Sequence, residues 1–274
     1  MSPSSMSGDA FSSRRRGLLA LAGLGMIAPV PLVRAVVAKQ GGPLAAPASA
    51  VRAWARGGRV DYEVLYGRMA LPLGRARHRW SHDGEHYRMS SEARATGLLS
   101  AIDGLSYVQR SEGRIRAWGL QPEHFEVERG GRRREWSEFD WGSGDVALYR
   151  DGEARHAPLR SGDQDVLSLW HQIGMVEPWA GEVSLTVVTG KSAAPSRLDY
   201  LPDEIVEVPA GRIDARHLRA AALDGSLVLE VWLAKESEHV PVRILMVDKK
   251  GETLDQRAQR IQVGSADDAV ERNR

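Results

Sequence analysis

The chain contains no cysteine. A disulfide framework is therefore excluded, and the fold must be stabilised by its core alone. The absence also excludes a lipidated cysteine at the start of a processed chain. We therefore expect a sizeable core and an end that carries no lipid.

Neither sign of charge is in clear excess. The sequence has 37 Lys and Arg residues against 36 Asp and Glu residues, which gives a formal net charge of +1. This balance gives no overall attraction for the phosphates of DNA or RNA. We expect no nucleic-acid partner.

Recognisable catalytic and metal-binding signatures are also missing. The sequence has no Gly-x-Ser-x-Gly elbow, no His-Glu-x-x-His motif and no phosphate-binding loop. His78, His82 and His86 have a metal-like spacing, but in an extended strand His78 and His82 lie roughly 13 Å apart and His86 turns to the other face. Asp163 and Asp165 do not share a helix face as an acid and base pair would. We predict no metal, no cofactor and no enzymatic activity.

Long hydrophobic runs are scarce as well. The run Gly17–Val33 contains three glycines and two prolines and is shorter than the roughly 20 strongly apolar residues of a membrane span. Paired arginines precede it in Ser13–Leu19, a pattern typical of a twin-arginine export signal. Small residues place a cleavage site after Ala35 or after Ala38. We expect export by the twin-arginine translocase, removal of residues 1–38 by a signal peptidase, and a periplasmic location.

The remaining chain divides into three parts. Residues 39–57 are rich in Gly, Pro and Ala and are predicted to be a flexible linker. Residues 58–264 carry regular apolar patterns and are predicted to form one domain. Residues 265–274 are charged and are predicted to be a disordered tail.

Alternation with a period of two is the main structural signal. Val60, Tyr62, Val64 and Tyr66 share one face of a predicted strand. Asp83-Gly84 predicts a tight hairpin that pairs Trp80 with Tyr87, His78 with Met89, Arg79 with Arg88 and Arg75 with Glu92. Gly130-Gly131 predicts a second hairpin that pairs Phe125 with Trp136 and Glu128 with Arg133.

Further strands are predicted downstream, with two helical segments. The apolar spacing and a Ser161 cap predict a helix over Ser161–Ile173, and Glu92–Ile102 is a weaker helical candidate. Pro241 predicts an edge strand or the first position of a strand. The predicted class is mainly β, a single highly curved antiparallel sheet or open barrel with one or two short helices. The strands expected after the helix are 183–188, 204–208, 227–233, 240–247 and 253–263.

Two surfaces are candidates for binding. Eight tryptophans against three phenylalanines favour a broad apolar cavity that could accept an acyl chain or a ring. Arginines also alternate along one strand, and the hairpin adds another; they form either a solvated outer face or a surface that binds anions. The predicted cavity residues are Tyr62, Tyr66, Trp80, Tyr87, Leu169 and Trp170, and the predicted anion-facing residues are Arg75, Arg77, Arg79 and Arg88.

Scattered stretches of the chain resemble a known family. They are Tyr62–Trp80, Leu159–Leu169, Val208–Leu218 and Leu229–Gly251. The family, domain of unknown function 3108, comprises exported proteobacterial proteins. The resemblance implies a curved sheet like that of periplasmic lipoprotein carriers, with an apolar hollow around a plug helix. It assigns no functional residue, because the family has no settled activity.

Three functions follow in order of preference. The first is a non-enzymatic periplasmic protein that binds a lipidic or other envelope ligand in the cavity. The second is an envelope assembly protein that acts through contacts with protein partners. The third is a hydrolase of cell wall or glycan.

Overall fold

The computed structural model describes residues 54–97, 106–176 and 183–264. The predicted signal, most of the predicted linker and the predicted tail lie outside these residues. The described strands are β1 Gly57–Tyr66, β2 Leu71–His82, β3 His86–Ala95, β4 Ser106–Arg116, β5 Gly119–Arg129, β6 Arg132–Asp140, β7 Asp145–Arg150, β8 Glu153–Pro158, β9 Gln164–Asp165, β10 Val183–Val188, β11 Ala193–Tyr200, β12 Glu204–Val208, β13 Gly211–Ala222, β14 Leu227–Ala234, β15 Pro241–Asp248 and β16 Thr253–Gly264, with helix α2 Ser168–Met175.

All these strands form one sheet of 16 strands. The order runs from β8 back to β1, continues through β16, β15, β14, β13, β11 and β10, and ends at β9, while β12 pairs with β13. Neighbouring strands are antiparallel except β9 and β10, which are parallel. The predicted class, a mainly β protein built on one highly curved and unclosed antiparallel sheet, is confirmed.

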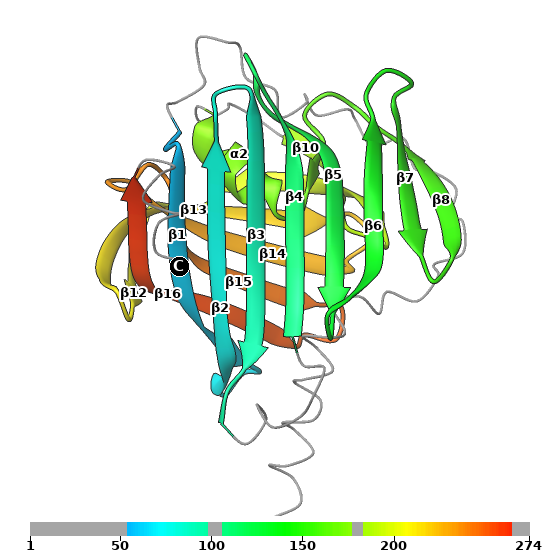
Figure 1. Ribbon diagram of the computed structural model, residues 1–274. Helices are drawn as coiled ribbons and strands as arrows, with labels where there is room; N and C mark the ends of the chain where they lie inside the picture. Colours follow the sequence, from blue (N-terminus) through cyan, green and yellow to red (C-terminus); the bar gives the residue numbers. More distant parts are fainter. Residues whose placement is uncertain (1–53, 98–105, 177–182, 265–274) are drawn as a thin grey trace, which may run out of the picture.

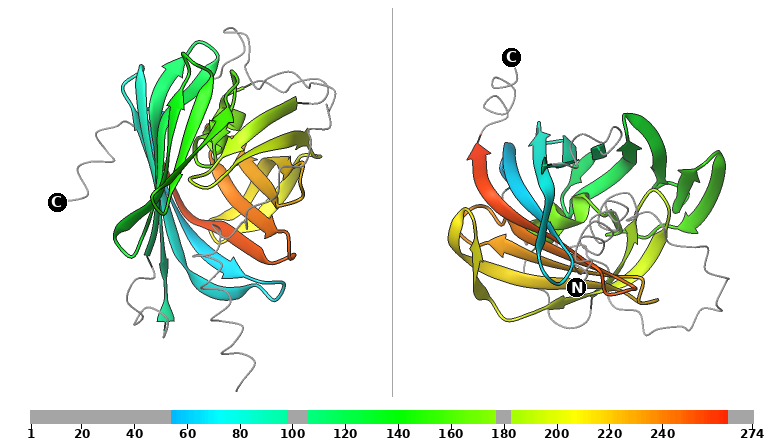
Figure 2. Two further views of the ribbon diagram at one scale, coloured as in Figure 1. Left: turned by 90° about the vertical axis from the view of Figure 1, so that its right-hand side faces the viewer. Right: turned by 90° about the horizontal axis from the view of Figure 1, so that it is seen from below.

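The sheet bends so that its two halves face each other. Figure 1 shows β1–β6 in front, with β13–β15 crossing steeply behind them and α2 enclosed between the two halves. The side view in Figure 2 shows the same separation. Inward side chains from both halves and from α2 belong to one hydrophobic core. The bend places the inner face around a helix and leaves the other face to solvent.

The alternation in β1 correctly predicts its buried face. Val60, Tyr62, Val64 and Tyr66 are all buried, with Tyr62 only 1% exposed. Tyr62 also donates a hydrogen bond from its hydroxyl to the Pro241 carbonyl at 2.6 Å. β1 is therefore tied to the start of β15 on the opposite half.

The first hairpin has a longer loop than predicted. His82 pairs with Tyr87, so Trp80 lies opposite Met89 and His78 opposite Ser91. The cause is Asp83, whose carboxylate accepts the backbone N–H groups of Glu85 and His86 and so stabilises a four-residue loop. A shift of two residues keeps every side chain on its predicted face. The predicted arginine pairings are nevertheless wrong: Arg79 lies opposite Ser90, and Arg75 opposite Arg94.

A β-bulge changes the second hairpin. Glu128 pairs with Arg133 as predicted, but a register shift between Val127 and Glu128 places Phe125 opposite Ser137 and Glu126 opposite Trp136. Trp136 therefore leaves the core face. Its ring stacks on Tyr149 at 4.8 Å, and the Arg133 guanidinium lies 4.4 Å from its centroid. The bulge inserts one extra residue, and this turns the tryptophan outward.

The predicted helix begins too early. Residues Ser161 and Gly162 form a turn with Gly162 at φ +93°, and Gln164 and Asp165 pair with β10 as the short strand β9. Only Ser168–Met175 is helical. The apolar spacing correctly predicts the helix, but the Ser161 cap is wrong.

The second helical candidate is wrong for Glu92–Ala95. These residues end β3, and Ala93 and Ala95 turn inward opposite Ala76 and Gly74 of β2. Small side chains suit this closely paired part of the sheet. Residues 98–102 of the candidate lie outside the described residues.

The predicted downstream strands are confirmed within one residue as β10, β12, β14, β15 and β16. Pro241 is the first residue of β15, an interior strand, so its role is strand entry and not an edge. The prediction missed β4, β7, β8, β9, β11 and β13. In the described part of the chain, no helix has the length and apolar character needed to cross a membrane.

Candidate functional site

Helix α2 is held inside the sheet by hydrogen bonds at its N-terminus. Asp165 accepts the backbone N–H groups of Leu167 and Ser168, both at 2.8 Å, through one carboxylate oxygen. Its other oxygen accepts the Ser111 hydroxyl of β4 at 2.6 Å, and Ser111 also contacts the Tyr87 hydroxyl of β3. Asp165 lies ahead of the first helical turn, which contains no acidic residue, but its hydrogen bonds hold the backbone where the helix begins and also join it to the wall. Burial raises the pKa of this carboxyl, although these hydrogen bonds oppose the shift.

A second set of hydrogen bonds fixes the body of the helix against β5. The Gln172 side-chain oxygen accepts the backbone N–H of Leu120 at 2.7 Å, and its amide nitrogen donates to the Trp118 carbonyl. Gln164 donates from its side chain to the Leu120 carbonyl at 2.9 Å. Every residue of α2 is buried. The helix is thus a plug tied to β3, β4 and β5 by polar groups in an apolar interior.

Two buried histidines connect the plug to β2. His171 of α2 and His78 of β2 approach with their Nε2 atoms 2.7 Å apart. Trp54 donates its indole N–H to His171 Nδ1 at 3.1 Å, so the neutral His171 carries its proton on Nε2 and donates to His78. Burial lowers the pKa of His78 to about 3 and, together with the neighbouring His78, holds the pKa of His171 well below its usual value. Both rings are therefore neutral at pH 7.

Aromatic rings surround this histidine pair. Trp80 lies 5.0 Å from the ring of His171, and Trp170 lies 5.6 Å from the ring of His78. Trp54 stacks on His82 at 4.7 Å. Trp54 lies in the segment predicted to be a linker, yet here it is part of the interior cluster.

The residues predicted to line a cavity are all inside the sheet. Leu169 and Trp170 come from α2, and the others come from β1, β2 and β3. Trp170 is 2% exposed, and its indole nitrogen has no hydrogen-bond partner in the described part of the chain. The two residues of α2 pack against the four residues of the sheet, so a ligand bound here would contact both the helix and the sheet. The whole set is Tyr62, Tyr66, Trp80, Tyr87, Leu169 and Trp170.

A pocket of about 700 Å³ lies on the opposite face of the sheet, over β1, β2, β3 and β16. This is the face of β1–β3 turned toward the viewer in Figure 1. Five arginines and two acidic residues line it, which gives the lining a formal charge of +3. The charged lining residues are Arg59, Arg75, Arg77, Arg94, Arg260, Asp61 and Glu92.

The pocket brings together part of the predicted anion-facing surface. Arg75 and Arg77 line it, and Arg79 pairs with its lining residue Glu92 at 3.3 Å. Arg88 lies elsewhere and faces Glu112 of β4 at 3.8 Å. The pocket also includes arginines of β1, β3 and β16 that the hairpin pattern could not indicate.

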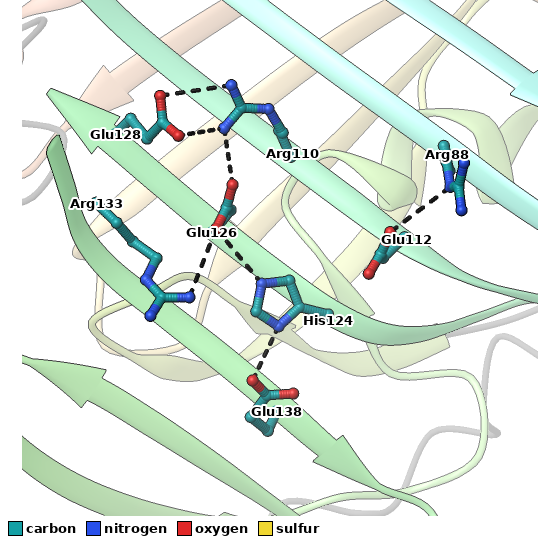
Figure 3. A network of polar contacts seen from close by, with 8 residues as sticks. All are labelled: Arg88, Arg110, Glu112, His124, Glu126, Glu128, Arg133 and Glu138. Atoms are coloured by element: carbon teal, nitrogen blue, oxygen red, sulfur yellow. Dashed lines mark hydrogen bonds and ion pairs between the residues drawn. The ribbon is translucent and has the colours of Figure 1, made fainter. Parts of the chain in front are cut away.

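The adjoining outer surface is a balanced charge network, drawn in Figure 3. Arg110 contacts both Glu126 and Glu128, and His124 lies between Glu126 and Glu138. Arg133 also reaches Glu126 at 3.9 Å. Each arginine drawn there has a glutamate within ion-pair distance. This surface is typical of a solvated sheet face.

The three histidines with a metal-like spacing do not converge, as the strand geometry predicted. His78 is buried in the interior, His82 stacks on Trp54, and His86 is exposed near Asp83. Within residues 54–97, 106–176 and 183–264, no three His, Asp or Glu side chains are grouped so that they could hold a metal ion.

One buried ion pair joins the two halves of the sheet, and we call it the seam. Glu135 of β6 contacts Lys191, in the turn between β10 and β11, at 3.2 Å, with side-chain exposures of 5% and 3%. Arg129 also reaches Glu135 at 3.2 Å. Burial lowers the pKa of Lys191 to about 8, against the opposing effect of Glu135.

Several of these residues carry no sequence signal. Lys191 follows Gly190 and resembles a solvated turn, and His171 and Gln172 lie between the apolar positions of the helix pattern. The strand order that brings Glu135 to Lys191 depends on contacts between distant segments. Only the run of polar residues within an otherwise apolar helix could have indicated that α2 has buried polar contacts.

The fold and the sites define a class: a mainly β protein whose single open sheet encloses a plug helix and carries an arginine-lined pocket on its outer face. A family model described as protein of unknown function (DUF3108) matches residues 61–257. The chain belongs to this family. No curated protein matches it significantly.

Two solved structures have similar chains at low identity. One is described as a candidate lipoprotein from Parabacteroides distasonis ATCC 8503, at 8% identity and a TM-score of 0.31, covering 81% of this chain and 100% of its own. The other is described as a candidate exported protein with a YmcC-like fold from Bacteroides fragilis NCTC 9343. It has 10% identity and a TM-score of 0.27, and the match covers 77% of this chain and 98% of its own.

Proposed function

We propose that this protein is an exported, non-enzymatic envelope protein that binds a lipidic ligand between α2 and the inner face of the sheet. The twin-arginine pattern supports export to the periplasm, where lipid must cross an aqueous space. The family resemblance, which implies a sheet like that of periplasmic lipoprotein carriers, agrees with the same location. The ligand has an apolar body and one hydrogen-bond acceptor.

The observation that carries this proposal is the indole N–H of Trp170. It is buried between the plug and the wall and has no hydrogen-bond partner in the described residues. An unsatisfied buried donor costs about 1–3 kcal/mol. A lipid carboxyl or ester oxygen could satisfy it, while the surrounding aromatic rings accept the chain without further polar contacts.

Native mass spectrometry of protein purified from periplasm tests the proposal, followed by titration with a dansyl-labelled fatty acid. We expect a co-purifying lipid and binding of the probe. Trp170→Phe keeps an aromatic ring, although a smaller one, and removes the donor, so the probe should bind about fivefold more weakly. Trp136→Phe makes the same change on the outer face and should leave affinity unchanged. A protein that carries no lipid and does not bind the probe would contradict the proposal.

A role in envelope assembly is the second candidate, and β8 favours it. This strand ends the sheet, and five of its six residues are exposed. A free strand edge can pair with a strand of a partner protein. Ala154 lies at a non-hydrogen-bonded position opposite Tyr149, so its N–H points to the open edge, and Ala154→Pro should then abolish capture of envelope partners without changing binding of the fatty-acid probe. Equal capture by this variant would exclude β8 as the docking edge.

The hydrolase alternative gains no support from the pocket. Its two carboxylates are held by arginines: Asp61 by Arg59 and Arg77, and Glu92 by Arg79 and Arg94. Although burial raises the pKa of Asp61, the two guanidinium groups outweigh it and lower that pKa. A general acid needs the opposite shift.

A further inference from the structure

We propose that the arginine-lined pocket over β1, β2, β3 and β16 is a binding site for a phosphoryl group. The group could belong to a lipid head group or to a free phosphoester, and both present the same oxygens to guanidinium donors. This inference is independent of the ligand proposed for the interior, because the pocket lies on the other face of the sheet.

The first support is an excess of positive charge that the protein does not neutralise. Arg75 lies directly opposite Arg94 in the sheet register, and like charges in this position are unfavourable. Arg75 has no ion pair or hydrogen bond in the described part of the chain, even with Glu63, its register partner on β1. Arg260, which lies opposite Asp61, likewise has none among the described residues.

The acidic residues of the pocket do not offset this excess, because each is shared. Asp61 accepts Arg59 at 3.1 Å and Arg77 at 2.6 Å. Glu92 lies 3.3 Å from Arg79 and 3.8 Å from Arg94. These contacts orient the guanidinium groups, and because each guanidinium has five N–H donors, they leave some donors unused.

The contrast with the neighbouring strands is the second support. In the network of Figure 3, every arginine has a glutamate partner, and glutamates outnumber arginines by four to three. In the pocket, by contrast, five arginines face two acidic residues. Positive neighbours also affect Arg79: burial, and then Arg77 and Arg59, lower its pKa against the effect of Glu92. A bound dianion would relieve this repulsion.

Size and side-chain chemistry define the ligand class. A pocket of about 700 Å³ is within the range of small-molecule sites and exceeds what a bare phosphate fills. Guanidinium forks match the oxygens of phosphate and bind them through paired hydrogen bonds. A phosphate esterified to a small polar group, such as glycerol, meets both conditions.

The test compares two probes on the full mature protein. Glycerol 3-phosphate is titrated by calorimetry, and vesicles of phosphatidylcholine with and without phosphatidylglycerol are tested by co-sedimentation. Binding of glycerol 3-phosphate would show that a free phosphoester is sufficient for binding to the pocket. Binding only to vesicles that contain phosphatidylglycerol identifies a lipid head group. Either result supports the site if the variants below behave as expected.

The double variant Arg75→Gln with Arg94→Gln should weaken binding of the active probe at least about tenfold, because charged hydrogen bonds are lost. Arg88→Gln is the matched control: it removes an exposed arginine from β3 outside the pocket and should leave affinity unchanged. Arg260→Gln, on β16, provides a second pocket variant should the double variant fold poorly. Binding of neither probe, or equal weakening by Arg88→Gln, would overturn the proposal. Its failure leaves the interior ligand untouched, since that is measured with the fatty-acid probe.

Discussion

At the scale of single residues, the interior combines apolar packing with neutral polar groups. His78 and His171 share one hydrogen bond, and in the described part of the chain neither ring has an acidic partner that could stabilise a positive charge. A proton added to either ring would therefore create a buried charge beside a second base. The stability of the folded chain should depend on pH through this pair.

We predict that the free energy of unfolding falls as the pH drops below about 6.5, the pKa of an unfolded histidine. Burial holds the folded pKa of His78 at about 3, so between these values only the unfolded chain takes up the proton. The contribution of His78 to the free energy of unfolding is fully present well above about pH 6.5. By pH 5 this residue alone lowers that free energy by about 2 kcal/mol. Asp163 and Asp165 have raised pKa values and act in the opposite sense, because the folded state takes up their protons first.

Urea unfolding between about pH 7.5 and pH 5 measures this dependence. His78→Gln should flatten the slope of stability against pH, since one of the two buried bases is gone. His86→Gln removes an exposed imidazole and serves as the control for losing a histidine. A slope that His78→Gln leaves unchanged would show that the pair is not responsible.

At the scale of elements, the sequence predicts strands better than it predicts their partners. The stripe of β14 and the alternation in β1 identify their buried faces, because a period of two follows from strand geometry itself. The bulge that turns Trp136 outward and the loop stabilised by Asp83 depend on hydrogen bonds, which the apolar alternation of the sequence does not indicate. The same holds for α2, which begins at Ser168 because Asp165, and not Ser161, binds the backbone N–H groups at its start.

The residues of the candidate sites could be predicted where they follow from alternation along a strand, but not where they depend on contacts between distant segments. The inward aromatic residues follow from alternation, and the arginines of β2 follow from it too. The arginines of β1 and β16 join the pocket through pairing across distant segments. His171 and Trp54 meet only once the plug is inside the sheet.

Asp165 should be the most sensitive position for the anchoring of α2. Asp165→Ala removes the acceptor for Leu167, Ser168 and Ser111, and we expect a loss of about 2–3 kcal/mol in the free energy of unfolding. Asp165→Asn keeps one oxygen for the two backbone N–H groups and should lose less. Hydrogen exchange at α2 reports whether the loss begins at the helix. Equal losses for both variants would show that the carboxylate charge, and not capping, matters.

At the scale of the whole molecule, an unclosed sheet needs contacts that keep its halves together. Tyr62 provides one between β1 and β15, and α2 provides others through Asp165 and Gln172. The seam lies at the opposite side, where β6 meets the β10–β11 turn. Ser137 supports it through a hydrogen bond to the Thr189 carbonyl at 3.1 Å. These contacts hold the two halves of the sheet against the plug.

Lys191 should therefore matter far more than its position in a turn indicates. Lys191→Met leaves Glu135 buried with Arg129 as its remaining partner, so we expect a loss near the lower end of the roughly 3–5 kcal/mol that a fully uncompensated buried charge costs. The double variant with Glu135→Gln also removes the buried carboxylate charge and should recover part of that loss. Arg114→Gln breaks an exposed pair with Glu123 and should cost less than about 1 kcal/mol. Urea unfolding compares the three, and hydrogen exchange in β6 and β10 shows whether the halves separate. If Lys191→Met is as mild as Arg114→Gln, the seam does not hold the sheet together, and the plug and Tyr62 must suffice.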